Sequence, residues 1–261
     1  MMAPVVVKLG GRAQGDPELP AALAAVWTAT RGRLVIVHGG GDQVSSWQRL
    51  RGDEPVFVGG RRVTQARDIE LVRMVLSGSV NKTLVGALRV AGVHAVGLSG
   101  EDGAMLRAAP VDPERFGRVG APAAVDARLL VTLLDGGWCP VVSPVGVSTD
   151  LTDPDALNVN GDDAAAALAV ALGASELFFL ADVPAVLDAD KAPIATIVHD
   201  DVQQWIDSGV AAGGMAAKLE AARQALAGGV GRVRIGDRAA LTQGGGTAIV
   251  PTAIASSPGT H

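Results

Sequence analysis

Short apolar runs alternate along this chain with longer stretches in which apolar residues recur at helical spacing. The runs typical of buried strands cover residues 5–9, 34–38, 95–98, 140–143, 177–180 and 232–235. The helical stretches cover residues 17–30, 65–91, 126–135, 162–172, 202–208 and 215–227, and another begins at residue 42. Strands that alternate with helices in this way are typical of βαβ units. The sequence therefore predicts an α/β fold, a three-layer αβα sandwich with a mainly parallel central sheet.

The longest helical stretch, residues 65–91, has one apolar stripe at spacings of three and four, made by Ile69, Val72, Leu76 and Val80. A break in this helix is expected near Gly78. Three glycines stand where helices should end and are expected to form left-handed caps: Gly92, Gly173 and Gly228. Segments 55–62, 105–120 and 144–157 are expected to be hairpins or loops that project from the sheet.

Composition limits the class of protein. Of the 261 residues, 48% are hydrophobic and 19% are charged, which is a globular composition, and the net charge of −5 argues against a broad nucleic-acid surface. No basic and apolar leader precedes the first strand, and no apolar stretch reaches transmembrane length, so no membrane partner is expected. Cys139 is the only cysteine, so no intrachain disulfide can form. We expect it to fill the core of a cytoplasmic protein.

Two glycine-rich strand exits are candidate anion sites. Lys8 lies in the first strand, and Gly10 and Gly11 follow it, while the strand at 34–38 leads into glycines 39–41. Glycine amides approach anions closely, and an ammonium group adds positive charge. Neither segment has the spacing of a P-loop or of a dinucleotide fingerprint. Two such exits in one parallel sheet predict a shared phosphate-binding crevice.

Asp162 and Lys218 are the other candidate residues. The segment NVNGDD precedes an alanine-rich helix, where acidic residues are favoured simply as caps and as partners of the helix dipole. The alternative is that Asp162 orients Lys8 and Lys218. Lys218 lies four residues after Gly214, near the start of another helix, where a cation opposes the dipole and so requires an anionic partner. The residues alone leave both interpretations of Asp162 open.

The chain resembles the N-acetylglutamate kinases of the amino acid kinase family. The similarity runs from residue 5 to about residue 250 through VVVKLGG, VIVHGGG, GRRVT, NKTLV, VGLSGEDG, PVVSPVGV, NVNGDDAAAALA, FLADVPAVLD and GMAAKLEA. It implies a carbamate kinase-like fold and transfer of the γ-phosphoryl group of ATP, bound with Mg²⁺, to the side-chain carboxylate of N-acetyl-L-glutamate, in arginine biosynthesis. Such a transfer needs positioning and charge neutralisation rather than a base, because the acceptor carboxylate is already ionised.

The resemblance also implies residue roles. Lys8 and Lys218 would stabilise the transferring phosphoryl group, and Asp162 would organise both lysines. The amino acid would be bound by Gly40, Gly41, Arg62 and Asn158. Arg62 would take its α-carboxylate, with Arg61 as the competing candidate. The phosphates and the nucleotide would be bound by Gly10, Gly11, Asp182, Val183, Pro184, Ala185, Val186, Leu187, Val210, Ala211, Ala212 and Gly214. No dedicated protein metal site is implied.

The resemblance further predicts lobes and assembly. Residues 1–172 would form a lobe for the amino acid substrate and for dimerisation, residues 173–250 a nucleotide-binding lobe, and residues 251–261 a disordered tail. Ala185 replaces the glycine of the common Asp-Val-Pro-Gly, and Gln243 replaces the glutamate of the common Glu-Gly. The chain also has no helix before its first strand, a feature of arginine-inhibited hexameric members. We therefore expect a homodimer that is insensitive to arginine.

Two other functions stay open at this point. A related kinase phosphorylates aminoadipate or glutamate attached to a carrier protein in lysine biosynthesis, and the Gly-Asp pair at residues 161–162 partly resembles that subgroup. The second alternative is a non-catalytic sensor of a nucleotide or metabolite, because a fold does not by itself establish catalysis. The joint presence of Lys8, Asp162 and Lys218 argues against a pure sensor.

Overall fold

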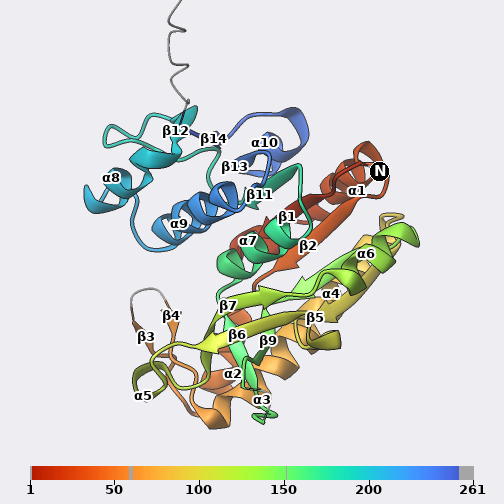
Figure 1. Cartoon of the computed structure of the whole chain (residues 1–261), viewed down its shortest axis with the longest axis vertical. Coiled ribbons are helices and arrows are strands. Elements are labelled where there is room, and N and C mark those ends of the chain that lie inside the picture. The colour runs from red at the N-terminus through yellow and green to blue at the C-terminus, as the bar shows by residue number, and fades with distance from the viewer. Residues whose placement is uncertain (1, 59–60, 151, 253–261) are drawn as a thin grey trace, which may run out of the picture.

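The computed structural model of the chain describes residues 2–58, 61–150 and 152–252. An eight-stranded sheet runs through its centre in the order β12-β14-β13-β11-β1-β2-β8-β5 (Figure 1). The strands are β1 Val5–Leu9, β2 Leu34–His38, β5 Ala95–Ser99, β8 Cys139–Ser143, β11 Glu176–Leu180, β12 Thr196–Val198, β13 Val233–Gly236 and β14 Thr247–Val250. Neighbouring strands are parallel except β13 and β14. The predicted mainly parallel sheet is confirmed.

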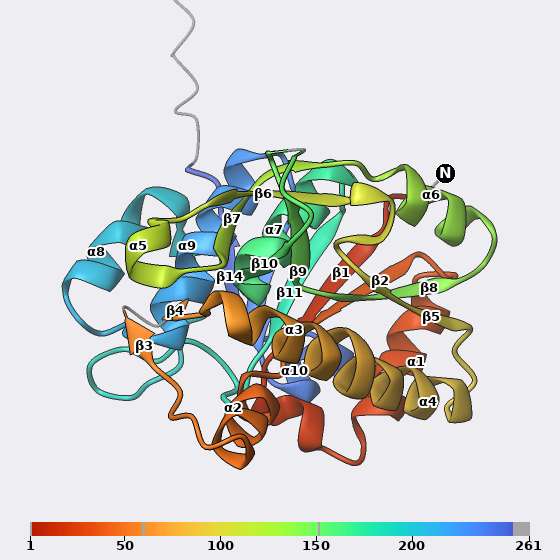
Figure 2. The ribbon, with the colours of Figure 1, turned by 90° about the horizontal axis from the view of Figure 1, so that it is seen from below.

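Helices cover both faces of this sheet (Figure 2). One face carries α6 (Arg128–Asp135), α7 (Gly161–Ala171), α8 (Val202–Asp207) and α9 (Gly214–Ala227), and the other carries α1 (Leu19–Ala29), α4 (Asn81–Val90) and α10 (Arg238–Gln243). Buried side chains alternate between the faces along each strand, so Val6 belongs to the core under α7 and Val7 to the core under α1. The predicted αβα sandwich is confirmed.

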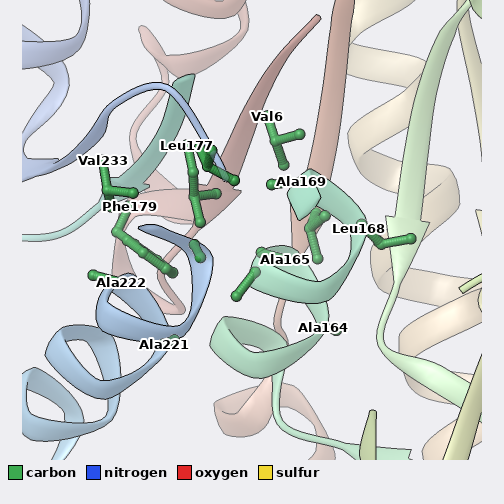
Figure 3. Packing of buried hydrophobic residues seen from close by; sticks show 14 of the residues in the cluster. Val6, Ala164, Ala165, Leu168, Ala169, Leu177, Phe179, Ala221, Ala222 and Val233 are labelled. Atoms are coloured by element: carbon green, nitrogen blue, oxygen red, sulfur yellow. The ribbon is translucent and has the colours of Figure 1, made fainter. Parts of the chain in front are cut away.

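Small side chains let α7 and α9 pack closely on the sheet. Figure 3 shows alanines of these helices opposite larger side chains of the central strands. The labelled helix residues include Ala164, Ala165, Ala221 and Ala222, and the strand residues are Val6, Leu177, Phe179 and Val233. Gly228 continues this pattern, because a Cβ atom there would lie 2.4 Å from Cγ2 of Val170 in α7. This close packing fixes the N-terminal end of α7 beside β1 and β2, which it contacts.

A small closed barrel joins the central sheet on one side (Figure 1). Its strands are β6 Leu106–Pro110, β7 Val119–Val125, β9 Val145–Ser148 and β10 Ala156–Val159. The barrel is tied to the sheet because β9 begins directly after Pro144, which follows β8, and β10 leads through Asn160 into α7. The hairpin of β3 (Phe57–Val58) and β4 (Arg61–Arg62) lies on the same side, with α2 (Gly41–Leu50), α3 (Ile69–Arg73) and α5 (Pro113–Phe116).

Two expectations about helices are wrong. The helix does not break near Gly78, because a π-helical segment, Met74–Val80, joins α3 to α4 and keeps the chain helical. Gly228 is not a left-handed cap, since its φ is −79° and the next residue, Gly229, has the φ of 93°. Gly228 instead allows the close approach to α7. The left-handed caps at Gly92 and Gly173 are confirmed, with φ values of 87° and 57°.

The three segments expected to be hairpins or loops all contain strands. Segment 55–62 contains the β3–β4 hairpin, and segments 105–120 and 144–157 contribute to the antiparallel pairs β6–β7 and β9–β10, which close into the barrel. Strands β12 and β14, which extend the sheet at one edge, were not predicted. Of the expected disordered tail at 251–261, residues 253–261 lie outside the described residues. Within the described ranges, no helix has both the length and the apolar character needed to cross a membrane.

Candidate active site

The site forms where β1 and β2 end. These strands pair in parallel with Leu9 opposite His38, so the glycines that follow each strand come out at the same edge of the sheet. Gly10 stays close to β11, because its N–H donates to the Leu180 carbonyl at 3.0 Å. A Cβ atom at this position would lie 2.8 Å from that oxygen, which leaves glycine as the residue that fits.

His38 holds the second glycine segment, Gly39–Gly41, in place. Its Nδ1 atom lies 2.8 Å from the Gly39 carbonyl, and its Nε2 atom lies 3.0 Å from Nδ2 of Asn81. Since the Asn81 amide can only donate there, Nδ1 carries the proton and donates to Gly39. Burial lowers the pKa of His38 to about 4, although the hydrogen bond to Gly39 opposes the shift. His38 is therefore a neutral structural group at pH 7.

The structure brings Lys8, Asp162 and Lys218 together. Lys8 Nζ lies 2.7 Å from Asp162 Oδ1, and Lys218 Nζ lies 3.4 Å from Asp162 Oδ2, so each carboxylate oxygen faces one ammonium group. The exposed fractions of these side chains are 9% for Lys8, 6% for Asp162 and 13% for Lys218. Burial lowers the pKa of Lys8, and the Asp162 carboxylate opposes that shift. Two cations share one anion, which leaves a net positive charge that suits an anionic group.

The start of α7 places Asp162. The Asn160 side chain caps the helix by accepting hydrogen bonds from the N–H groups of Asp162 at 2.8 Å and Asp163 at 3.3 Å. Gly161 lets the helix approach β1, since a Cβ atom there would lie 3.2 Å from Cε of Lys8. The cap interpretation of this segment therefore holds for Asn160, and it coexists with the ion pairs of Asp162.

A pocket of about 160 Å³, here called the Arg62 pocket, opens beside the second glycine segment. Its lining contains Gly39, Gly40, Gly41, Val44, Phe57, Arg61, Arg62, Val72, Leu76, Pro144, Asn158, Val159, Asn160 and Gly161. The four residues predicted to bind the amino acid, Gly40, Gly41, Arg62 and Asn158, are all in this lining. Aliphatic side chains from α2, α3 and the π-helical segment give the pocket an apolar wall as well.

Arg62 is a buried cation without a carboxylate partner. Its guanidinium donates to Gln48 Oε1, to the Gly41 carbonyl at 2.7 Å and to Ser45 Oγ at 2.7 Å, and it lies 4.6 Å from the centre of the Phe57 ring. Among the residues that the structure describes, no carboxylate lies within ion-pair distance of this guanidinium. Burial lowers the pKa of Arg62 accordingly. A buried, pre-positioned guanidinium of this kind suits an anionic ligand.

Asn158 and Thr64 join the barrel to the strand that holds Arg62. The Asn158 side-chain amide donates to Thr64 Oγ1 at 2.9 Å, and the Thr64 backbone exchanges hydrogen bonds with Phe116 and Arg118. Because Thr64 lies two residues after Arg62, these bonds help to fix both sides of the pocket relative to each other.

A second pocket of about 380 Å³, here called the Lys218 pocket, lies beyond the ion pairs. Its lining contains Gly10, Gly11, Ala13, Asp42, Ala181, Asp182, Val183, Gly214, Met215 and Lys218. Five of the positions predicted for the phosphates and nucleotide, Gly10, Gly11, Asp182, Val183 and Gly214, are in this lining. The other seven positions are absent from it: Pro184, Ala185, Val186, Leu187, Val210, Ala211 and Ala212. Ala185, Val186 and Ala211 are buried in the protein, so direct nucleotide contact by these seven stays a prediction.

Sequence reasoning missed several lining residues. Val72 and Leu76 belong to the predicted apolar stripe, but periodicity cannot show that part of such a stripe faces a pocket. Asp42 and Met215 line the Lys218 pocket because each lies next to a predicted glycine at the start of a helix. That adjacency was a usable signal, and it was not used.

Comparisons with known proteins agree with this geometry. The model of the amino acid kinase family matches residues 3–237. The chain is 45% identical over 232 residues to the acetylglutamate kinase of Rubrobacter xylanophilus, covering 88% of this chain and 87% of that one. The crystal structure of smu.665 from Streptococcus mutans superposes with a TM-score of 0.84 at 32% identity, covering 94% of this chain and 98% of that one.

A more distant structure shows the fold alone. Carbamate kinase from Giardia lamblia, bound to AMP-PNP, has a TM-score of 0.69 and 16% identity, with 96% of this chain and 99% of that chain covered. The predicted carbamate kinase-like fold is thereby confirmed. Three findings lead to one assignment: the family model matches most of the sequence, the Rubrobacter xylanophilus enzyme is similar over most of its length, and the fold is shared. This chain belongs to the amino acid kinase family.

Proposed function

We propose that this protein transfers the γ-phosphoryl group of ATP to the side-chain carboxylate of N-acetyl-L-glutamate, giving N-acetyl-L-glutamyl 5-phosphate and ADP in arginine biosynthesis. Relatives at 40–45% identity that share most of its length are acetylglutamate kinases. These relatives favour this acceptor over a carrier-linked amino acid and favour an enzyme over a sensor.

One observation carries the proposal: the ion pairs of Asp162 connect a residue that lines one pocket with the neighbour of a residue that lines the other. Gly161, next to Asp162, lines the Arg62 pocket, while Lys218 lines the Lys218 pocket. Lys8 is held between them by its ion pair with Asp162. A phosphoryl group passing from a nucleotide in one pocket to an acceptor in the other would therefore pass beside two ammonium groups.

The chemistry needs no base from the protein. An oxygen of the acceptor carboxylate attacks the γ-phosphorus, the bond from that phosphorus to the bridging oxygen breaks, and ADP leaves with the electron pair. Lys8 and Lys218 neutralise charge that develops on the transferring oxygens. Asp162 fixes both ammonium groups before substrates arrive, so their orientation costs little during the reaction. Glycine amides at Gly11 and Gly40 would add hydrogen bonds to the oxyanions.

Arg62 and Asn158 would hold the acceptor. A guanidinium that already donates to three protein oxygens and is buried needs an anion to balance its charge, and the α-carboxylate of N-acetyl-L-glutamate supplies one. The aliphatic wall of the Arg62 pocket suits the uncharged parts of such a small amino acid derivative.

Mg²⁺ would arrive with ATP, and phosphate oxygens and water would be its main ligands. When bound, the ion would neutralise phosphate charge and orient the γ-phosphoryl group. Asp42 and Asp182 are the carboxylates in the lining of the Lys218 pocket and would add negative charge for such an ion. Among the described residues, no group of three or more His, Cys, Asp or Glu side chains could hold a metal ion on its own.

We assign residues 1–172 to the acceptor and dimerisation lobe and residues 173–250 to the nucleotide lobe. The Arg62 pocket supports this division because its lining lies before residue 162, whereas six of the ten residues that line the Lys218 pocket come from the later part. We also propose a homodimer insensitive to arginine. Light scattering that gave a hexamer, or inhibition by micromolar arginine, would contradict this assembly.

The test of the function is Mg-ATP-dependent formation of a hydroxamate, because hydroxylamine traps acyl phosphates. N-acetyl-L-glutamate should give robust turnover, whereas free glutamate and N-acetyl-aminoadipate should give little. Equal turnover of all three would contradict the assigned acceptor. Absence of turnover with every acceptor, despite measurable ATP binding, would contradict the assigned acceptor and would favour a carrier-linked acceptor first and a sensor second.

A further inference from the structure

Arg61 stands between the Arg62 pocket and a second cavity. It lines the Arg62 pocket, and it also lines a groove of about 520 Å³ that runs between β7, α7 and α9. The groove walls are mostly small apolar side chains, and Arg61 and Asp163 are its charged lining residues. A guanidinium in this position can present nitrogen atoms to a ligand in the pocket while another part of it is held by the protein.

One nitrogen of Arg61 is bound and another is not. Arg61 Nη2 donates to Asp163 Oδ2 at 3.1 Å, which joins β4 to the first turn of α7. The Nη1 atom is buried and has no hydrogen-bond acceptor among the described residues. Leaving a buried charged donor without an acceptor is costly, so an acceptor from outside the chain would stabilise this nitrogen.

Asp163 is suited to holding this arginine. Its side chain is only 13% exposed, and Arg61 is its ion-pair partner. Burial raises the pKa of Asp163, and Arg61 opposes that shift, so the arginine helps keep the carboxylate ionised. Counting Lys8, Lys218 and Arg61 against Asp162 and Asp163, the connected charges sum to one net positive. The pair therefore holds Arg61 without neutralising the site.

We propose that Arg61, held by Asp163, is a second oxyanion-binding arginine of the Arg62 pocket, and that its Nη1 atom donates to the acceptor's α-carboxylate alongside Arg62. Asp163 acts through Arg61 and is a positioning residue. This inference rests on the proposed function, because it names a second contact for the same acceptor. It gives both adjacent arginines a contact with the acceptor, whereas the sequence alone left them as competing candidates.

The test varies the enzyme and the acceptor together. The variants are Arg61→Leu, Arg61→Lys and Asp163→Asn, and the acceptors are N-acetyl-L-glutamate and its α-carboxamide, which keeps the reacting side-chain carboxylate. Loss of a charged hydrogen bond should lower kcat/KM of Arg61→Leu on N-acetyl-L-glutamate by roughly 10- to 100-fold, mainly through KM. The same substitution should change kcat/KM on the α-carboxamide by less than about threefold, because that acceptor lacks the oxyanion.

The other variants separate the charge of Arg61, the planar geometry of its guanidinium and the support that it receives from Asp163. Arg61→Lys keeps the charge but loses the planar fork, so it should restore part of the loss. Asp163→Asn should raise KM for N-acetyl-L-glutamate less than Arg61→Leu does. Arg67→Leu is the matched control, because Arg67 Nη2 also donates to an aspartate oxygen at 3.1 Å but does not line the Arg62 pocket. It should leave KM unchanged.

Equal losses on the two acceptors would overturn the proposal and leave Arg61 with a purely structural role. Unchanged kcat/KM of Arg61→Leu on N-acetyl-L-glutamate would overturn it as well. Thermal melting of each variant shows whether a loss of activity comes from unfolding. If Arg61→Leu is unfolded, the test uses Arg61→Lys and Asp163→Asn instead and again compares kcat/KM on the two acceptors. If the unaltered protein turned over neither acceptor, the proposed function would fail instead.

Discussion

Lys8 Nζ lies 2.7 Å from Asp162 Oδ1, in a buried ion pair between the central strand β1 and the first turn of α7. The lysine is on the same face of β1 as Val6, toward α7, because side chains alternate along a strand. Both partners are thus held by rigid elements rather than by loops, and a buried pair of this kind gains from fixed geometry. This arrangement holds a buried ammonium group in a fixed position.

Removing either lysine should therefore damage turnover more than binding. We predict that Lys8→Met and Lys218→Met each lower kcat by roughly 100- to 1,000-fold, with KM for ATP and acceptor changed only a few-fold, because the lysines act most strongly on charge that develops during transfer. Steady-state kinetics with the hydroxamate readout measures this. Lys191→Met, at an exposed loop position, is the control and should be as active as the unaltered protein. A kcat within threefold of the unaltered value for either active-site variant would rule out this role.

The sequence was most informative where both faces of an element are buried. The bounds of β1 and β2 follow from continuous apolar runs at 5–9 and 34–38, and a parallel order then brings their glycine exits together. Strand β12 was not predicted because it has three residues, which are too few to show the alternation of apolar and polar residues that indicates a strand. The barrel segments were expected only as hairpins or loops, because their apolar runs are short and broken by polar residues and prolines. Their closure into a barrel depends on pairing between segments far apart in the sequence.

Some residues of the candidate site could also be predicted from the sequence, and others could not. Lys8 and Lys218 stand out because a lysine is unusual in a buried strand and near the start of a helix. Asp162 is an ordinary residue at the start of a helix, and only the resemblance favoured a role for it with the lysines. Arg61 and Arg62 are adjacent and chemically identical, so only tertiary contacts distinguish them: one pairs with Asp163, and the other is buried without a carboxylate among the described residues. The spacing of residues in the sequence cannot predict that difference.

His38 predicts a pH dependence of stability. Its pKa is about 4 in the folded protein against 6.5 for an ordinary histidine, with burial as the main cause and Lys82 and Lys8 also lowering it. The unfolded chain therefore takes up a proton below pH 6.5 while the folded protein does not. Stability from the neutral imidazole is fully present above pH 6.5 and is lost as the pH falls toward 4. The loss amounts to about 3 kcal/mol.

Urea unfolding at several pH values checks this. The free energy of unfolding of the unaltered protein should fall relative to His38→Asn between pH 6.5 and 4, since carboxylates titrate in both proteins and cancel in the difference. Parallel curves for the two proteins would show that His38 does not titrate as described.

Cys139 should be inert while the protein is folded. Its side chain is fully buried, and burial raises the pKa of the thiol to about 12, so almost no thiolate exists at pH 7.5. We predict no alkylation by iodoacetamide over an hour in the native protein and rapid alkylation in urea, followed by mass spectrometry. Cys139→Ala should keep kcat within about twofold, because the thiol is a core filler. Fast native labelling coupled to loss of activity would contradict this interpretation.

Gly40 should resist even the smallest substitution. A Cβ atom there would lie 2.7 Å from Leu76 Cδ2 and 3.2 Å from Val80 Cγ2, both in the π-helical segment that packs under the glycines. Gly40→Ala must therefore displace the side chains of Leu76 and Val80 or the glycine segment itself, at a cost of about 1–3 kcal/mol in the free energy of unfolding. We expect kcat/KM for N-acetyl-L-glutamate to fall roughly 10-fold, since a shift of the backbone misplaces the acceptor.

Leu76 provides the decisive comparison for Gly40. Shortening it in Gly40→Ala/Leu76→Ala removes the nearest clashing atom, so the double variant should recover stability relative to the sum of the single variants. Gly78→Ala is the matched control, because a Cβ atom there meets nothing within 4 Å, and this variant should melt within a few degrees of the unaltered protein. Additive losses in the double variant would show that the close approach of Gly40 to the π-helical segment does not fix the glycine segment. A coupling that restores both melting temperature and kcat/KM would show that the helix positions the acceptor end of the site.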